Sequence, residues 1–121
     1  MTTAQVRSLA GLVLLLLLVS GASEWWREHQ ATALGRQLAL ASRPGDIEML
    51  SSVNCVFCER ARRWMTVHQV PFKECFIERD AVCARRYQAL GERGTPTLLV
   101  RGQAQPGFSA ERVLAGLAAR P

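Results

Sequence analysis

The sequence has only one lysine among its fifteen basic residues, and its fourteen arginines form no long basic run. They alternate with acids instead, as in Glu59-Arg60 and Glu78-Arg79. A nucleic-acid surface would be expected to gather cations and aromatic residues on one face. The net charge of +5 therefore indicates a solvated surface of mixed charge, and we expect no nucleic-acid partner.

The chain also lacks the length for more than one domain with appendages, at 121 residues, and it contains no internal repeat. Changes of composition along it separate three parts. We expect a signal peptide or membrane anchor at 1–23, a helical stalk or linker at 24–45 and a folded domain at 46–121. Nothing in this organisation requires a second subunit, so we expect a monomer.

Charge is missing altogether between Arg7 and Glu24, where residues 9–19 are almost entirely apolar. Small residues follow at 20–22, in the positions that a signal peptidase reads. A charged start, a short apolar core and a small-residue end are the anatomy of a signal peptide. The position of Arg7 before the run favours an N-terminus that stays inside.

Two tryptophans leave a second interpretation of this leader open. Trp25 and Trp26 follow the apolar run directly, and aromatic residues of this kind gather at membrane surfaces. They would extend a span that is otherwise short, and they slightly favour a retained single-pass anchor over a cleaved signal. Either interpretation exports the rest of the chain, to the periplasm or to the extracytoplasmic face of a membrane.

From residue 46 onward, apolar runs and helical patterns alternate. Helix-forming residues over 24–42 end at Pro44-Gly45, which breaks a helix. Beyond that break the patterns predict strands at 47–51, 72–77 and 97–100, a short fourth strand after the turn at 102–103, and helices at 56–69, 80–90 and 109–119. The order β-α-β-α-β-β-α predicts an α/β fold with one mixed sheet, preceded by the N-terminal hydrophobic helix.

Cys55-Val56-Phe57-Cys58 is the strongest chemical signal, because it follows a predicted strand and opens a predicted helix. Unpaired N–H groups at a helix N-terminus stabilise a thiolate, so Cys55 is expected to attack and Cys58 to resolve. A zinc half-site and a pair of inert buried thiols are the alternatives.

Residues 46–120 resemble the glutaredoxin family within the thioredoxin fold. The resemblance depends on the strand-CxxC-helix unit, on Gly94-Thr95-Pro96-Thr97 and on Gly107-Phe108 before the last helix. It implies a minimal thioredoxin-like fold and a cis Pro96 beside the cysteines. It also implies that substrate contacts come from Phe57, Thr95, Pro96, Gly107 and Phe108.

The chain departs from the family where glutathione is held. Ser51-Ser52-Val53-Asn54 contains no lysine before the first cysteine, and Val56-Phe57 replaces the usual Pro-Tyr. Ser109 follows Gly107-Phe108 where an acid is usual. The resemblance implies glutathione as a thiol, whereas these replacements argue against it. We expect no cofactor and no metal.

Cys75 and Cys83 form a second pair, one late in a predicted strand and the other one turn into the next helix. A turn between them would bring the two within bridging distance, and export favours a structural disulfide. Two free thiols are the alternative, and a site of four cysteines around zinc has less suitable spacing.

These features together predict a thiol–disulfide oxidoreductase that acts outside the cytoplasm on protein or small-molecule disulfides. Two other classes remain open. The CxxC thiolates would also suit a carrier of copper or an iron–sulfur unit, and the fold alone would suit a non-enzymatic binding module tethered to a membrane.

Overall fold

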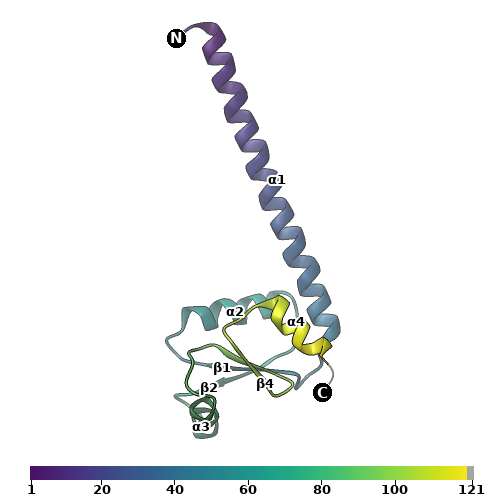
Figure 1. Ribbon diagram of the computed structural model, residues 1–121, viewed down its shortest axis with the longest axis vertical. Helices are drawn as coiled ribbons and strands as arrows, with labels where there is room; N and C mark the ends of the chain where they lie inside the picture. The colour runs from purple at the N-terminus through teal and green to yellow at the C-terminus, as the bar shows by residue number, and fades with distance from the viewer. Residues whose placement is uncertain (120–121) are drawn as a thin grey trace. The chain divides into compact units, whose positions relative to one another are not determined.

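Four strands and four helices make up the computed structural model, which describes residues 1–119 (Figure 1). In chain order they are α1 (Thr3–Ala41), β1 (Ile47–Ser51), α2 (Val56–Val67), β2 (Lys73–Phe76), α3 (Ala81–Ala89), β3 (Thr97–Val100), β4 (Gln103–Pro106) and α4 (Ala110–Ala118). The predicted α/β class, the element order and the preceding apolar helix are confirmed.

The strands form one mixed sheet in the order β2-β1-β3-β4. β1 and β2 run parallel because α2 carries the chain back between them, whereas β1–β3 and β3–β4 are antiparallel. Leu50 pairs with Cys75 on one side and with Thr97 on the other. The register therefore brings the end of β1, which leads to Cys55, beside the start of β3, which follows Pro96.

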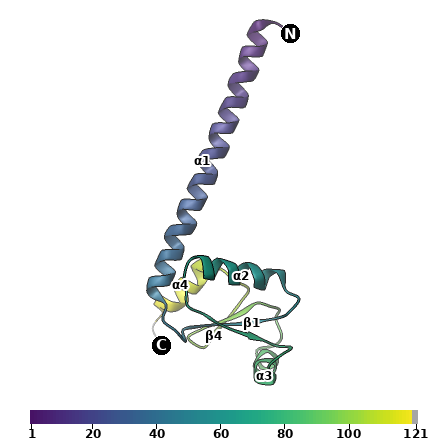
Figure 2. The same ribbon diagram turned by 180° about the vertical axis from the view of Figure 1, so that it is seen from behind.

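Helices cover both faces of this sheet, and the two views agree on the arrangement: α2 and α4 lie on one face and α3 on the other (Figures 1 and 2). Alternate residues of each strand serve the two faces. Met49 and Leu98 are fully buried under α2 and α4, whereas Leu50 packs with Cys83 of α3. The alternation explains why strands this short can hold two layers of helices.

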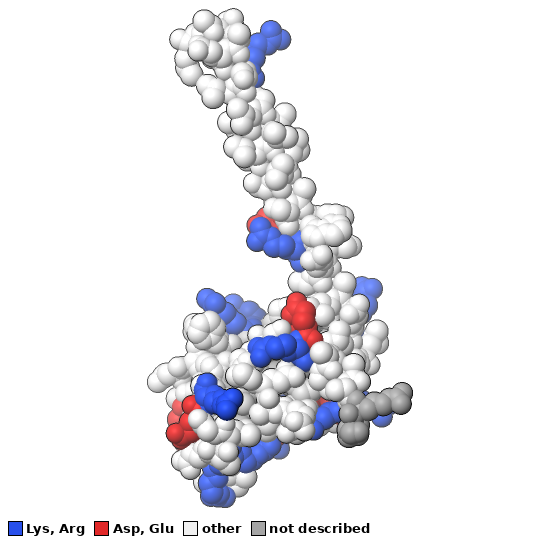
Figure 3. All heavy atoms as spheres, in the orientation of Figure 1, with Lys and Arg blue, Asp and Glu red and all other residues white. Residues whose placement is uncertain are grey.

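The first part of α1 satisfies the length and composition of a membrane span. An 18-residue window of it has a mean hydropathy of 2.0, and none of that window is buried within the protein. The stretch without Lys, Arg, Asp or Glu is visible as uninterrupted white spheres (Figure 3). A signal sequence passes the same test, so both fates predicted for the leader fit this helix.

The last two turns of α1 belong to the compact unit, which begins at Leu34. Leu38 is fully buried in the core under α2 and α4, and its carbonyl accepts a hydrogen bond from the Ser42 hydroxyl at 2.7 Å. Gly35 is also buried, close against His68 at the end of α2. The domain thus includes residues that composition alone assigned to the stalk, because Pro44-Gly45 marks a turn and not the edge of the core.

Candidate active site

Cys55 is the N-cap of α2, at the point where β1 gives way to the helix. Its Sγ accepts a hydrogen bond from the N–H of Cys58 at 3.1 Å, so the sulfur faces the unpaired amides of the first helical turn. Cys55 and Cys58 are joined by a disulfide with their Cα atoms 5.2 Å apart. The predicted pair is therefore brought together at a helix N-terminus.

The two sulfur-bearing residues differ in accessibility. Cys58 is fully buried, whereas Cys55 is partly exposed. Around Cys55 the surface is apolar: Val53, Val56 and Phe57 are 45%, 55% and 63% exposed. A bound partner would cover these side chains, and an attacking group from outside would reach Cys55 first.

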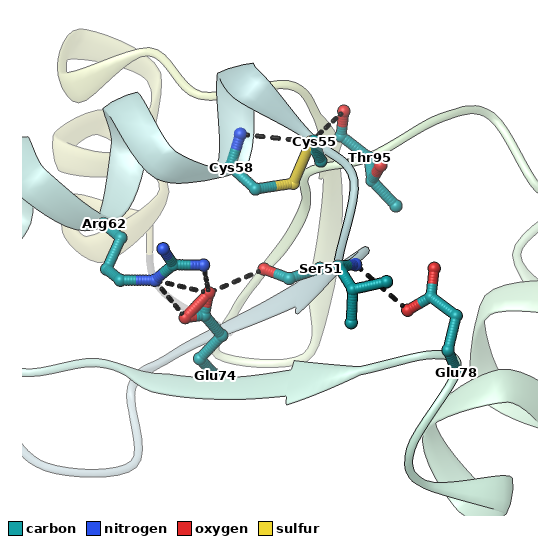
Figure 4. A network of polar contacts seen from close by, with 8 residues as sticks. Ser51, Cys55, Cys58, Arg62, Glu74, Glu78 and Thr95 are labelled. Atoms are coloured by element: carbon teal, nitrogen blue, oxygen red, sulfur yellow. Dashed lines mark hydrogen bonds and ion pairs between the residues drawn. A yellow bond between two sulfur atoms is a disulfide. The ribbon is translucent and has the colours of Figure 1, made fainter.

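The loop before β3 lies directly beside Cys55. The Thr95–Pro96 peptide bond is cis, and the Thr95 carbonyl oxygen lies 3.4 Å from Cys55 Sγ (Figure 4). The Pro96 carbonyl accepts a hydrogen bond from the Gly107 N–H at 2.8 Å. Gly107 has a φ of +69°, which favours glycine at the turn from β4 to α4.

Tyr87 supports this loop from α3, a role that the sequence did not suggest. Its hydroxyl oxygen accepts a hydrogen bond from the Gly94 N–H at 3.0 Å. The Thr97 hydroxyl donates to the Gly94 carbonyl at 2.7 Å, so both backbone polar groups of Gly94 have partners. The only signal in the sequence was that the chain's single tyrosine lies shortly before Gly94-Thr95-Pro96.

A groove of about 540 Å³ runs beside the cysteines, between α2 and the loops that precede β3 and α4. All five residues that the resemblance implied as substrate contacts line it. The lining consists of Phe57, Arg60, Ala61, Trp64, Arg93, Gly94, Thr95, Pro96, Gly107, Phe108 and Arg112.

The Glutaredoxin family model matches residues 47–104, from β1 into β4. The chain carries a glutaredoxin domain. The match includes Cys55, Cys58 and Thr95-Pro96, and it ends before Gly107 and Phe108.

Comparison with solved structures finds thioredoxin-like proteins and glutaredoxins among the similar chains. The thioredoxin-like protein BC3987 is 22% identical with a TM-score of 0.51, and the match covers 58% of this chain and 97% of that protein. Wheat glutaredoxin is also 22% identical, with a TM-score of 0.49 and coverage of 73% and 91%. At this identity the likeness to BC3987 shows a thioredoxin-like fold. No curated protein matches the chain.

An ion pair between Arg62 and Glu74 connects α2 with the sheet of the glutaredoxin domain near its two cysteines. Arg62 Nε–H is shared between the two carboxylate oxygens of Glu74 on β2, at 2.7 and 2.9 Å, and Arg62 Nη2 donates a further hydrogen bond to Glu74 at 2.6 Å. The Ser51 hydroxyl at the end of β1 also donates to Glu74, at 3.1 Å (Figure 4). The hydrogen bonds that Arg62 donates to Glu74 raise the pKa of Arg62 above its ordinary value. The network ties β1, β2 and α2 together one turn of helix after Cys58.

A second carboxylate holds the segment that leads to Cys55. Glu78 accepts a short hydrogen bond from the Ser52 hydroxyl and another from the Val53 N–H, the latter at 3.2 Å. The Ser52 hydrogen bond lowers the pKa of Glu78 below its ordinary value of 4.5. Because β2 ends just before Glu78, this contact holds the segment before Cys55 from the side of the neighbouring strand.

The second cysteine pair is a disulfide on the opposite face of the sheet. Cys75 of β2 and Cys83 of α3 have Cα atoms 6.0 Å apart, and Cys83 is fully buried. Cys58 belongs to α2, on the other face. Within residues 1–119, no group of three or more His, Cys, Asp or Glu side chains has the geometry to hold one metal ion. The two pairs of the glutaredoxin domain are therefore separate.

Proposed function

We propose that this chain is a thiol–disulfide oxidoreductase that exchanges disulfides through Cys55 and Cys58. The observation that carries the proposal is the asymmetry of the pair. Cys55 caps a helix N-terminus and is accessible, whereas Cys58 is buried one turn inward. Glutaredoxin family membership supports the same chemistry.

In the first step the Cys55 thiolate attacks one sulfur of a substrate disulfide. A new bond forms between Cys55 Sγ and that sulfur, the substrate S–S bond breaks, and the other substrate sulfur leaves as a thiolate that takes a proton from solvent. The N–H of Cys58 and the positive end of the α2 dipole stabilise the negative charge on Cys55 before the attack.

In the second step Cys58 loses its proton and attacks Cys55 Sγ. The Cys55–Cys58 bond forms, the mixed disulfide breaks, and the second substrate sulfur leaves as a thiolate. The substrate has gained two electrons and the protein has lost two. The reverse sequence oxidises a dithiol substrate, so the direction depends on the potential of the partner.

The surroundings of Cys55 favour an extended substrate. No hydrogen bond within residues 1–119 uses the Thr95 N–H, so this donor is free to pair with substrate backbone. Thr95, Val56 and Phe57 then supply one polar and two apolar contacts to the residues on either side of the reacting sulfur.

We place this activity outside the cytoplasm, on a chain that is exported by the apolar part of α1 and either anchored by it or released. The support is the uncharged stretch after Arg7, together with a second disulfide of the kind that persists in oxidising compartments. A reporter enzyme that works only after export should be active when it is fused after Pro121, and a reporter that works only in the cytoplasm should be inactive there. Activity of a cytoplasm-only reporter would contradict the location.

The exchange function is tested by equilibrating the full chain in neutral detergent with a thiol–disulfide buffer of stepped ratio. Alkylation followed by peptide mass mapping then reports each cysteine pair separately. We expect Cys55–Cys58 to open reversibly in a single two-electron transition. A pair that never equilibrates with the buffer, or that opens only on unfolding, would reject the function.

A further inference from the structure

Three arginines that line the groove beside Cys55 have no acidic partner. Arg60, Arg93 and Arg112 form no ion pair within residues 1–119, and no Asp or Glu is among the residues that line the groove. Elsewhere in the domain Arg62 pairs with Glu74 and Arg86 with Glu48, whereas the exposed Arg85 also forms no ion pair within residues 1–119. The groove therefore carries a local excess of positive charge that the fold does not use.

Two of the three guanidinium groups lie close to other residues of the groove. The Arg60 guanidinium carbon lies 5.7 Å from the centre of the Phe57 ring, within cation–π distance of the residue between the two cysteines. Arg112 lies beside Gly107, where a Cβ would come within 3.8 Å of its Nη2. Two of the charges thus lie on opposite sides of the groove.

The groove has the length of a short extended peptide. Its α2 side runs from Phe57 to Trp64, a rise of about 10 Å at 1.5 Å per residue. An extended chain covers that length in about three residues. Trp64 and Phe108 close the far end, with ring centres 5.4 Å apart, and the unpaired Thr95 N–H lies at the cysteine end.

The charges in the groove distinguish two kinds of substrate, glutathione and internal segments of proteins. Glutathione carries two carboxylates, which the arginines can pair with, and one α-ammonium group, which no carboxylate lines the groove to receive. An internal segment of a protein has no such ammonium, and acidic side chains on it would pair with the arginines. We infer that the groove selects protein disulfides in which the attacked cysteine is flanked by Asp or Glu. This inference rests on the proposed exchange function.

The exposure of the three arginines sets the size of the effect. All three side chains are exposed, so solvent screens each ion pair. Exposed pairs of this kind change binding by about two- to fivefold each, and they act mainly on the rate of association. The preference for acid-flanked substrates should therefore shrink as ionic strength rises.

The test compares exchange rates of the full chain in neutral detergent with four disulfides. They are an acid-flanked model peptide disulfide, the same peptide with Gln in place of each acid, glutathione disulfide and the uncharged hydroxyethyl disulfide. The variants are Arg60→Gln, Arg93→Gln, Arg112→Gln and their combination. Arg85→Gln, an exposed change on α3 across the sheet, is the matched control.

We expect the parent to prefer the acidic peptide over its Gln counterpart by about tenfold at low salt, and the triple variant to lose that preference. The preference is the ratio of the two peptide rates, and the rate on hydroxyethyl disulfide reports any change in the reactivity of Cys55 itself. Arg85→Gln should change neither the preference nor the rate on hydroxyethyl disulfide. An unchanged preference in the triple variant, or faster turnover of glutathione disulfide than of the acidic peptide, would overturn the inference about acidic substrates but leave the exchange function standing. Absence of exchange with all four disulfides would instead reject the underlying function.

Discussion

The N–H of Cys58 donates a hydrogen bond to the sulfur of Cys55, 3.1 Å away. A sulfur thus occupies the capping position that Ser, Thr, Asp or Asn usually fills at the start of a helix. The same contact begins α2 and directs partial positive charge at the sulfur to which we assign the attack.

The two cysteines should therefore respond differently to replacement by serine. Cys55→Ser keeps a hydroxyl that can cap α2, so the domain should stay folded while exchange is lost. Cys58→Ser keeps the nucleophile and removes the group that resolves the intermediate, so mixed disulfides should accumulate on non-reducing gels. Mixed disulfides in the Cys55 variant, or their absence in the Cys58 variant, would show that the roles of the two cysteines are not those proposed.

Tyr87→Phe should loosen the loop that carries Thr95 and Pro96. Removing the hydroxyl leaves the Gly94 N–H without its acceptor, although water can replace it because Gly94 is exposed. We expect a loss of about 0.5–1 kcal/mol in stability and a severalfold lower exchange rate. The direct measurement is hydrogen exchange at the Gly94 amide, which should become faster. Unchanged protection there would mean that Tyr87 only packs.

Loss of the Cys75–Cys83 disulfide should destabilise the domain without removing activity. The bridge closes a loop with a sequence separation of 8, for which chain entropy predicts about 2 kcal/mol. A variant with both residues changed to Ala should unfold at a lower denaturant concentration and still exchange disulfides at Cys55. Loss of exchange in a folded double variant would show that the second pair takes part in the reaction.

Gly35→Ala should destabilise the domain, although alanine normally favours a helix over glycine by about 0.5–1 kcal/mol. A Cβ at this position would lie 2.8 Å from the Cβ of His68, which is too close for two side chains. We expect a net loss of about 1–3 kcal/mol in thermal or denaturant unfolding. Adding His68→Ala should recover much of it. A stabilised single variant would mean that residues 34–41 do not pack on the domain.

Acid should weaken the segment before Cys55 through Glu78. Hydrogen bonding to Ser52 lowers the pKa of Glu78 in the folded state, so its contribution is present above the ordinary value of 4.5 and is lost as pH falls through the lower folded value. Glu78→Gln should flatten the fall in stability below about pH 4.5, measured by denaturant unfolding from pH 7 to pH 3. Glu92→Gln, in an exposed loop, should leave the profile unchanged.

The local pattern of apolar and capping residues was enough to predict the element order and the position of the CxxC motif at the N-terminus of α2. The expected helix at 56–69 is observed at Val56–Val67 and the expected strand at 72–77 at Lys73–Phe76, because alternation and capping residues are properties of neighbours in the chain. Helix ends differ by one or two residues, where caps compete with a further turn.

Contacts between distant elements could not be predicted in this way. The Tyr87–Gly94, Arg62–Glu74 and Glu78–Ser52 hydrogen bonds depend on which strand lies beside which and in what register. Composition also did not indicate that the C-terminal end of α1 packs into the core of the domain. Leu38 is one apolar residue among helix formers, and only packing against the sheet layer distinguishes it from the rest.

The strand order β2-β1-β3-β4 makes β2 and β4 the edge strands of the sheet, and both resist the addition of a further strand. Each edge strand is four residues long, too short to template a stable pairing with another chain. β2 begins with the exposed Lys73, the single lysine of the sequence, and β4 ends with Pro106, which has no amide hydrogen to offer. These features protect the sheet from the edge-to-edge aggregation to which exposed edge strands are prone, so copies of the domain at high concentration would stay separate.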